Sequence, residues 1–156
     1  MAVGHNEIAY AFLPDGRLLA AARSESGHVA VIWSDDAGRT WTKPVQVTRD
    51  GEHPADLTVL ASGRVQMTFG RRIRPMGAGL LFSSDGGRTW DTRREVLLAG
   101  DGVRNGDLGY PSTVQLGDGT LVTALYYASG SETGADWGGW GDISCQAIHY
   151  REEDVT

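Results

Sequence analysis

The residue types best suited to chemistry in this chain are a tyrosine, a carboxylate and an arginine, at Tyr110, Glu7 and Arg23. A tyrosine beside a carboxylate can act as a nucleophile, because the carboxylate accepts the phenolic proton. The guanidinium group of an arginine is planar, and it can bind a substrate carboxylate through two parallel hydrogen bonds. These residues lie up to 103 positions apart. The chemistry therefore depends on a fold that brings them together.

An internal repeat predicts such a placement. A strand, a turn with glycine and a second strand occur three times, with the turn glycines at positions 16, 63 and 119. Nine positions before these glycines stand Glu7, Pro54 and Tyr110, and seven positions after them stand Arg23, Gly70 and Tyr126. Equivalent positions of repeated units lie at equivalent places. We therefore expect these positions to lie together at one end of the axis around which the repeated units are arranged, and we call this end the mouth. The residues expected there are Glu7, the His53-Pro54 pair, Tyr110, Arg23, Arg71 and Tyr126.

A second repeat is more specific. Residues 34–41 and 83–90 both read S-x-D-x-G-x-T-W, 49 positions apart. A period in the forties is typical of one four-stranded propeller blade. In such a turn, the aspartate side chain bonds backbone N–H groups and the tryptophan packs between sheets. The pattern predicts that Asp36 and Asp85 lock their turns, and that Trp41 and Trp90 lie in the core.

The strand pattern predicts an all-β fold of about eleven strands, without helical periodicity. In the first unit, strands are expected at 28–33 and 43–48 after the glycine turn, and in the second at 79–83 and 94–98. The third unit has only a strand at 142–150 after its turn, so its blade is incomplete. The blades are expected at about 5–49, 53–99 and 108–152, within one domain over 1–156.

The repeated phrase is the Asp-box, and the chain resembles the sialidase (BNR-repeat) family of β-propellers. Sialidases have six blades, and this chain resembles the C-terminal three, nearly end to end. In that family the Asp-box lies on the outer edge, away from the substrate. The resemblance therefore implies half of a six-bladed propeller, and it assigns a structural role to the Asp-box residues.

The resemblance extends to the candidate site. The segment from Asn6-Glu7 to Arg23 resembles the sialidase stretch that carries the catalytic glutamate and an arginine of the carboxylate-binding triad. The segment around Tyr110-Pro111 resembles the stretch with the nucleophilic tyrosine, and sialidases are the glycosidases that use one. Arg71 or Arg72 matches the third arginine loosely. Adjacent strand residues point to opposite faces, so at most one of them lines the mouth.

Two family features have no match. The early arginine, in a phrase of the Arg-Ile-Pro type, and the acid/base aspartate belong to the N-terminal half of the family's propeller. Arg72-Ile73-Arg74-Pro75 is only superficially similar and falls in the wrong blade. His53 and Asp56 are the candidates to replace the acid/base group.

Composition and charge exclude some classes of binding partner and cofactor. The formal net charge is −6 and the sequence pI is about 5.1, which argues against nucleic acid or an anionic membrane as partner. Cys145 is the only cysteine, so no internal disulfide forms; its alternating apolar context predicts a buried thiol. No cofactor is indicated, because there is no metal-ligand cluster and no phosphate-binding glycine loop. No signal peptide is seen, which fits a cytoplasmic protein or a piece of a longer secreted one.

Three blades leave sheet faces and edges open, whereas closed propellers usually have four to eight. Either two copies close a six-bladed ring as a symmetric homodimer, or the chain is half of a longer protein. The loop 129–142 adds Trp137 and Trp140, which are suited to stacking on sugars or to covering a blade edge.

Three functions follow as alternatives. One is a sialidase-like glycoside hydrolase, or half of one, acting on a terminal carboxylated sugar. Another is a non-catalytic propeller that binds carbohydrate or protein. The last is a self-assembling fragment without activity of its own.

Overall fold

The computed structural model describes residues 4–102, 107–129 and 142–155. These residues form an all-β chain, as expected, with two short 3-10 turns. The strands are β1 (His5–Phe12), β2 (Leu18–Ser24), β3 (Val29–Ser34), β4 (Val45–Gln46), β5 (Glu52–Val59), β6 (Val65–Arg71), β7 (Gly77–Ser83), β8 (Val96–Ala99), β9 (Gly109–Gln115), β10 (Leu121–Ser129) and β11 (Asp142–Tyr150). The 3-10 turns are η1 (Thr92–Arg94) and η2 (Glu152–Val155). Within these ranges no helix has the length and apolar character to cross a membrane.

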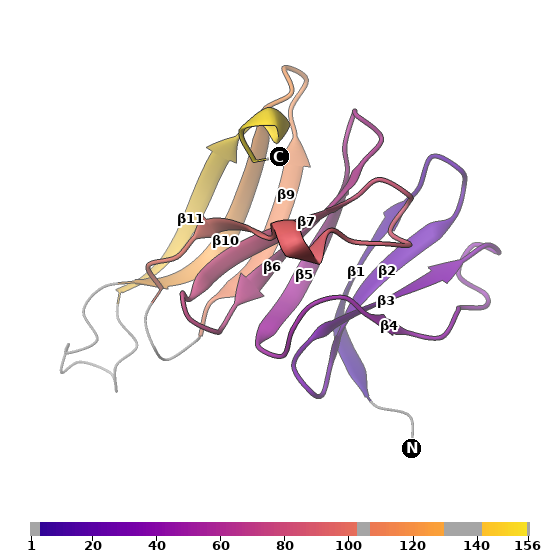
Figure 1. The fold of residues 1–156 in the computed structure, drawn as a ribbon, viewed down its shortest axis with the longest axis horizontal. Helices are drawn as coiled ribbons and strands as arrows, with labels where there is room; N and C mark the ends of the chain where they lie inside the picture. The colour runs from indigo at the N-terminus through magenta and orange to yellow at the C-terminus, as the bar shows by residue number, and fades with distance from the viewer. Residues whose placement is uncertain (1–3, 103–106, 130–141, 156) are drawn as a thin grey trace.

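The strands form three separate antiparallel sheets, or blades, with the orders β1-β2-β3-β4, β5-β6-β7-β8 and β9-β10-β11. Figure 1 shows the blades side by side in chain order. The first strand of each blade contacts the first strand of the next, β1 against β5 and β5 against β9. These inner strands therefore converge on one axis. Within the described residues the third blade has three strands.

Stacking of the sheets buries both faces of the middle blade. Every residue of β6 and β7 is buried, which explains why their sequences lack the polar alternation of a half-exposed strand. One core cluster joins the first and second blades and includes Leu19, Val31, Met67 and Phe69. Two further clusters join the second and third blades, with Leu80 and Tyr127 among their members. Burial between blades is thus the main stabilising term of the fold.

The two Asp-box turns have the same internal hydrogen bonds. One Asp36 oxygen accepts from the Thr40 amide at 2.8 Å and from the Ser34 hydroxyl at 2.8 Å, and the other accepts from the Thr40 hydroxyl at 2.6 Å. Asp85 repeats this set with Thr89 and Ser83. The Thr40 and Ser34 hydrogen bonds favour the ionised form and lower the pKa of Asp36 to about 2. Both turns follow the third strand of their blade, so they lie at the end opposite to the start of the inner strand.

Two sequence-based predictions were wrong at the open ends of the stack. Cys145 is exposed instead of buried, because it lies on β11, and no further blade of the described residues covers that sheet. Trp41 is 41% exposed, whereas Trp90, its counterpart, packs against the core between the first two blades. A blade therefore buries its Asp-box tryptophan on the preceding blade, and the described chain has no blade before the first.

Candidate functional site

Each inner strand begins with an irregularity at the position that the turn glycines align. The pairing register shifts between Asn6 and Ala9 in the first blade, between Glu52 and Ala55 in the second and between Ala124 and Tyr126 in the third. Glu7 and Tyr110 have positive φ values of 48° and 52°, a conformation uncommon for residues other than glycine. Such bulges redirect a side chain out of the regular alternation. Here they affect the two residues expected to do chemistry.

The redirected side chains meet. The Tyr110 hydroxyl donates to Glu7 Oε1 at 2.9 Å, and Arg23 Nη1 donates to Glu7 Oε2 at 3.0 Å. Tyr110 is 51% exposed, so its hydroxyl is accessible from outside while the carboxylate holds it. The Glu7 carboxylate therefore bridges a nucleophile candidate from the third blade and a cation from the first.

An arginine of the second blade completes this group, and it is Arg72. Its guanidinium carbon lies 5.9 Å from the centroid of the Tyr110 ring, and its Nε donates to the Leu108 carbonyl at 3.1 Å. We call Glu7, Arg23, Arg72 and Tyr110 the mouth site. The alignment had assigned this place to Arg71, one residue earlier.

The structure directs Arg71 elsewhere. Its Nε donates to Glu95 at 2.9 Å and lies 3.7 Å from a Glu52 oxygen, while Nη1 donates to the carbonyls of Ile73 and Pro75. Glu52 and Glu95 also bind Arg49. Arg71 is 8% exposed, so it is part of a buried ion-pair network. The reason is strand geometry, since consecutive residues at a strand end point to opposite sides.

The charge state of Glu7 follows from its partners. Partial burial by itself raises the pKa of Glu7, but the hydrogen bonds from Arg23 and Tyr110, with the charges of Arg23 and Arg72, outweigh it and lower the pKa below the ordinary value. Glu7 is therefore ionised at neutral pH and can accept a hydrogen bond from the phenol. A carboxylate in this state is what a tyrosine nucleophile needs as proton acceptor.

His53 lies beneath the mouth site and is 6% exposed. Its Nδ1 is buried and has no hydrogen-bond partner in the part of the chain that is described. Burial, followed by the charges of Arg23 and Arg72, lowers the pKa of His53 to about 4. The imidazole is consequently neutral at pH 7 and carries no proton to give as a general acid.

This burial predicts a pH-dependent loss of stability. Unfolded His53 takes up a proton near pH 6.5 and the folded residue only near pH 4. Between these values the unfolded chain holds the extra proton, so the free energy of unfolding should fall as pH falls, by about 3 kcal/mol over the window. Urea denaturation of the protein and of His53→Gln between pH 4 and 7 measures the difference. His5→Gln, at an exposed position at the start of β1, should keep the wild-type slope; equal slopes for all three proteins would contradict the expectation.

The other predicted site residues divide between the mouth and its surroundings. Asp56 lines a shallow pocket of about 330 Å³ with Glu7, Pro54 and Tyr110. Its Oδ2 accepts the Thr113 amide at 2.7 Å, and burial raises its pKa, opposed by backbone hydrogen bonds. Tyr126 donates to Asp107 at 3.4 Å. Trp137 and Trp140 lie outside the described residues.

Close backbone contact holds the mouth together. A Cβ atom added to Gly70 would lie 2.7 Å from Gly109 Cα and 2.8 Å from the His53 carbonyl oxygen. Only a glycine lets the backbones of the second and third blades approach so closely. Since Gly109 immediately precedes Tyr110, this contact fixes where the third blade presents the phenol.

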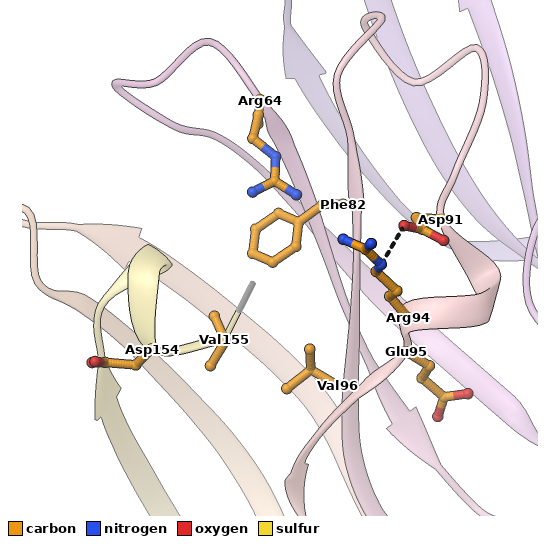
Figure 2. Close-up of a pocket in the computed structure, with 8 residues that line it drawn as sticks. All are labelled: Arg64, Phe82, Asp91, Arg94, Glu95, Val96, Asp154 and Val155. Carbon is orange, nitrogen blue, oxygen red and sulfur yellow. Dashed lines mark ion pairs between the residues drawn. The ribbon is translucent and has the colours of Figure 1, made fainter.

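A larger cavity, of about 560 Å³, lies at the end of the blades that carries the Asp-box turns (Figure 2). Its apolar lining is formed by Phe82, Val96 and Val155, and Arg64 stacks 4.0 Å from the Phe82 ring centroid. Phe82 is the repeat counterpart of Trp33, whose Nε1 donates to the Gly86 carbonyl of the next blade's Asp-box turn at 3.2 Å. The cavity is therefore a seam between the second and third blades. The described residues contain no cluster placed to hold a metal ion.

Short antiparallel sheets, stacked face to face with their first strands on a common axis, define a β-propeller protein. The chain belongs to the BNR repeat-like domain family, whose model matches residues 2–137. No curated protein sequence matches it.

Solved structures share the fold. A protein of unknown function from Dyadobacter fermentans aligns with a TM-score of 0.78 and 24% identity over 94% of this chain and 38% of that one. The intramolecular trans-sialidase of Ruminococcus gnavus aligns at 0.61 and 16% identity, over 98% and 34% of the two chains. The α-L-arabinanase of Penicillium chrysogenum aligns at 0.51 and 16%, over 93% and 62%. The chain thus spans between about a third and three fifths of these proteins' lengths.

Proposed function

We propose that this chain contributes half of a glycoside hydrolase site for a terminal carboxylated sugar. The observation that carries the proposal is the Glu7 carboxylate held between the Tyr110 hydroxyl and Arg23. In this reaction the Tyr110 oxygen bonds to the anomeric carbon as the glycosidic bond breaks, and the phenolic proton passes to Glu7. Arg23 and Arg72 bind the sugar carboxylate.

The departing oxygen needs a proton from an acid. Asp56 suits this role better than His53, because burial raises the pKa of the Asp56 carboxyl and the residue lines the same pocket as Tyr110. His53 is neutral and enclosed. Asp56 is thus the proposed general acid of the described residues.

The partner in this proposal is a second copy of the chain, which closes a six-bladed ring and forms the opposite wall of the channel. The fold relatives named above include a trans-sialidase and an arabinanase, which supports a sugar as the ligand class. The arginines favour an acidic sugar over a neutral one.

Binding of two matched probes tests the ligand class. The probes are the α-methyl glycoside of N-acetylneuraminic acid and its methyl ester, which lacks the negative charge. The free acid should bind and the ester should bind at least about tenfold more weakly, since a charge-assisted hydrogen bond contributes about 1.5–3 kcal/mol. Arg23→Gln should abolish this preference, measured by titration calorimetry or ligand-observed NMR.

Arg94→Gln is the matched control, because Arg94 is 83% exposed and lies at the opposite end of its blade. It should retain the preference for the acid. Equal binding of both probes by the unmodified protein would reject carboxylate recognition.

The second candidate function is sugar binding without turnover. It is favoured by the exposed Tyr110 ring beside Arg72, which can contact a sugar without reacting with it. Release of the fluorophore from 4-methylumbelliferyl N-acetylneuraminide separates the two, since the binding function predicts affinity for the acid probe and no release. If the protein neither bound the acid probe nor released the fluorophore, the remaining alternative would be a self-assembling fragment without activity of its own.

A further inference from the structure

The two ends of the blade stack expose apolar side chains at positions that are buried between blades elsewhere in the chain. On the first blade, Tyr10 and Phe12 are 68% and 70% exposed. Counted from the turn glycines, their counterparts in the second blade are Leu57 and Val59, which pack in the core against the first blade. The first blade therefore presents the same side that the second blade uses to contact its predecessor.

The third blade has the complementary side open. Val114 and Leu116 are 53% and 46% exposed. Their counterparts in the first blade are Ala11 and Leu13, which belong to the core that contacts the second blade. We call the open side of the first blade, with Tyr10 and Phe12, the backward face, and the open side of the third blade, with Val114 and Leu116, the forward face.

Inside the chain a forward face always packs on a backward face. Leu13 and Val59 lie in one cluster in this way, and Leu116 and Phe12 occupy the same two repeat positions. Both open faces are apolar. The backward face presents the aromatic rings of Tyr10 and Phe12. The forward face continues from Val114 to Val122 on β10 and to the Ala124–Ala147 pair on β10 and β11, and it includes Ile143, which is 48% exposed. Apolar surfaces of this kind are suited to packing against each other.

We propose that a second copy of this chain docks on both faces at once, its backward face on the forward face of the first copy and the reverse. This inference rests on the ring-closing partner proposed above but not on hydrolysis. Two copies give six blades, within the usual range of four to eight for closed propellers, whereas one gives three and three give nine. The two-fold axis then runs along the channel, and both contacts are identical.

The exposed area is consistent with a stable pair. One chain exposes 8427 Å², whereas a compact protein of 16.7 kDa exposes about 7,600 Å². The excess of about 800 Å² is the area that each partner buries in an interface of standard size. Trp41, half-exposed in the single chain, would be buried by this contact, as Trp90 is within the chain.

A charge exchange across the interface tests the pairing. The variants are Phe12→Lys and Leu116→Glu, both at exposed positions, so each chain should fold, as circular dichroism verifies. Each variant alone places one charge in both contacts and should have the mass of one chain, about 17 kDa, by light scattering on a size-exclusion column. The unmodified protein should have about 33 kDa, as should Leu97→Lys, a control at an exposed apolar position on β8.

The equimolar mixture of the two variants distinguishes this arrangement from other dimers. A mixed pair has one unmodified contact and one contact in which lysine meets glutamate, so the mixture should return to about 33 kDa. A dimer through two backward faces would not recover, and such a result overturns the proposal. A monomeric unmodified protein overturns it independently of any variant, and so does a larger or open-ended assembly. These masses do not depend on turnover, so a dimer without activity would reject only the hydrolase.

Discussion

Tyr110→Phe is expected to lower turnover of an aryl sialoside by at least about 10³-fold, because it removes the atom that forms the covalent bond in the proposed mechanism while leaving the ring in place. The Tyr110 hydroxyl donates a 2.9 Å hydrogen bond to Glu7. The ring itself stays beside Arg72. Affinity for the acid probe should therefore change little, and the loss should fall on kcat.

Tyr10→Phe is the matched control for this variant. Tyr10 lies on β1, the inner strand of the first blade, and it is 68% exposed. Loss of its hydroxyl should leave kcat unchanged. If Tyr110→Phe and Tyr10→Phe had the same turnover, Tyr110 would not be the nucleophile, whatever the assembly state of the protein.

The second large effect is expected for stability, from Asp85→Ala. This change removes three hydrogen bonds from Ser83 and Thr89 to one carboxylate. The turn that they hold also docks on the first blade. The Gly86 carbonyl accepts a hydrogen bond from Trp33 Nε1, and the Trp90 side chain packs on the core that the first two blades share. We expect a loss of about 3 kcal/mol in the free energy of unfolding, measured by urea denaturation.

Asp36→Ala provides a matched comparison, since its turn has the same internal hydrogen bonds. Within one chain, however, that turn has no preceding blade to contact, and Trp41 is half-exposed. Its loss should be clearly smaller than that of Asp85→Ala in dilute monomer. Equal losses would mean that docking of the turn on a neighbouring blade adds nothing to stability.

Sequence repeats predicted the fold because each blade is built from the same local signals. The positions of turn glycines and Asp-boxes determine strand order, and most strand ends differ from the structure by one or two residues; Asp142–Tyr150 agrees fully. The alignment also indicated the shared mouth, since positions nine before the turn glycines all begin an inner strand. Burial at the outer blades could not be predicted in this way, because Trp41 and Cys145 depend on neighbours beyond the three blades.

The finer geometry of the mouth depended on features that the sequence does not display. Glutamate and tyrosine are not residues that signal positive φ, yet Glu7 and Tyr110 both adopt it. The choice between Arg71 and Arg72 is decided by Glu52 on β5 and by Glu95, just before β8, which both contact Arg71. Such long-range partners become visible only when the blade is assembled.

The Asp-box turns and the mouth site occupy opposite ends of each blade, which gives the chain an unusual freedom to diverge. Substitutions at Glu7, Arg23 or Tyr110 leave the bonds of Asp36 and Asp85 untouched. Substitutions at the mouth can therefore change ligand preference while the Asp-box turns at the other end maintain the structure of the blades. The same division makes the protein a suitable starting point for directed evolution, with libraries confined to the inner-strand openings and the signature turns held constant.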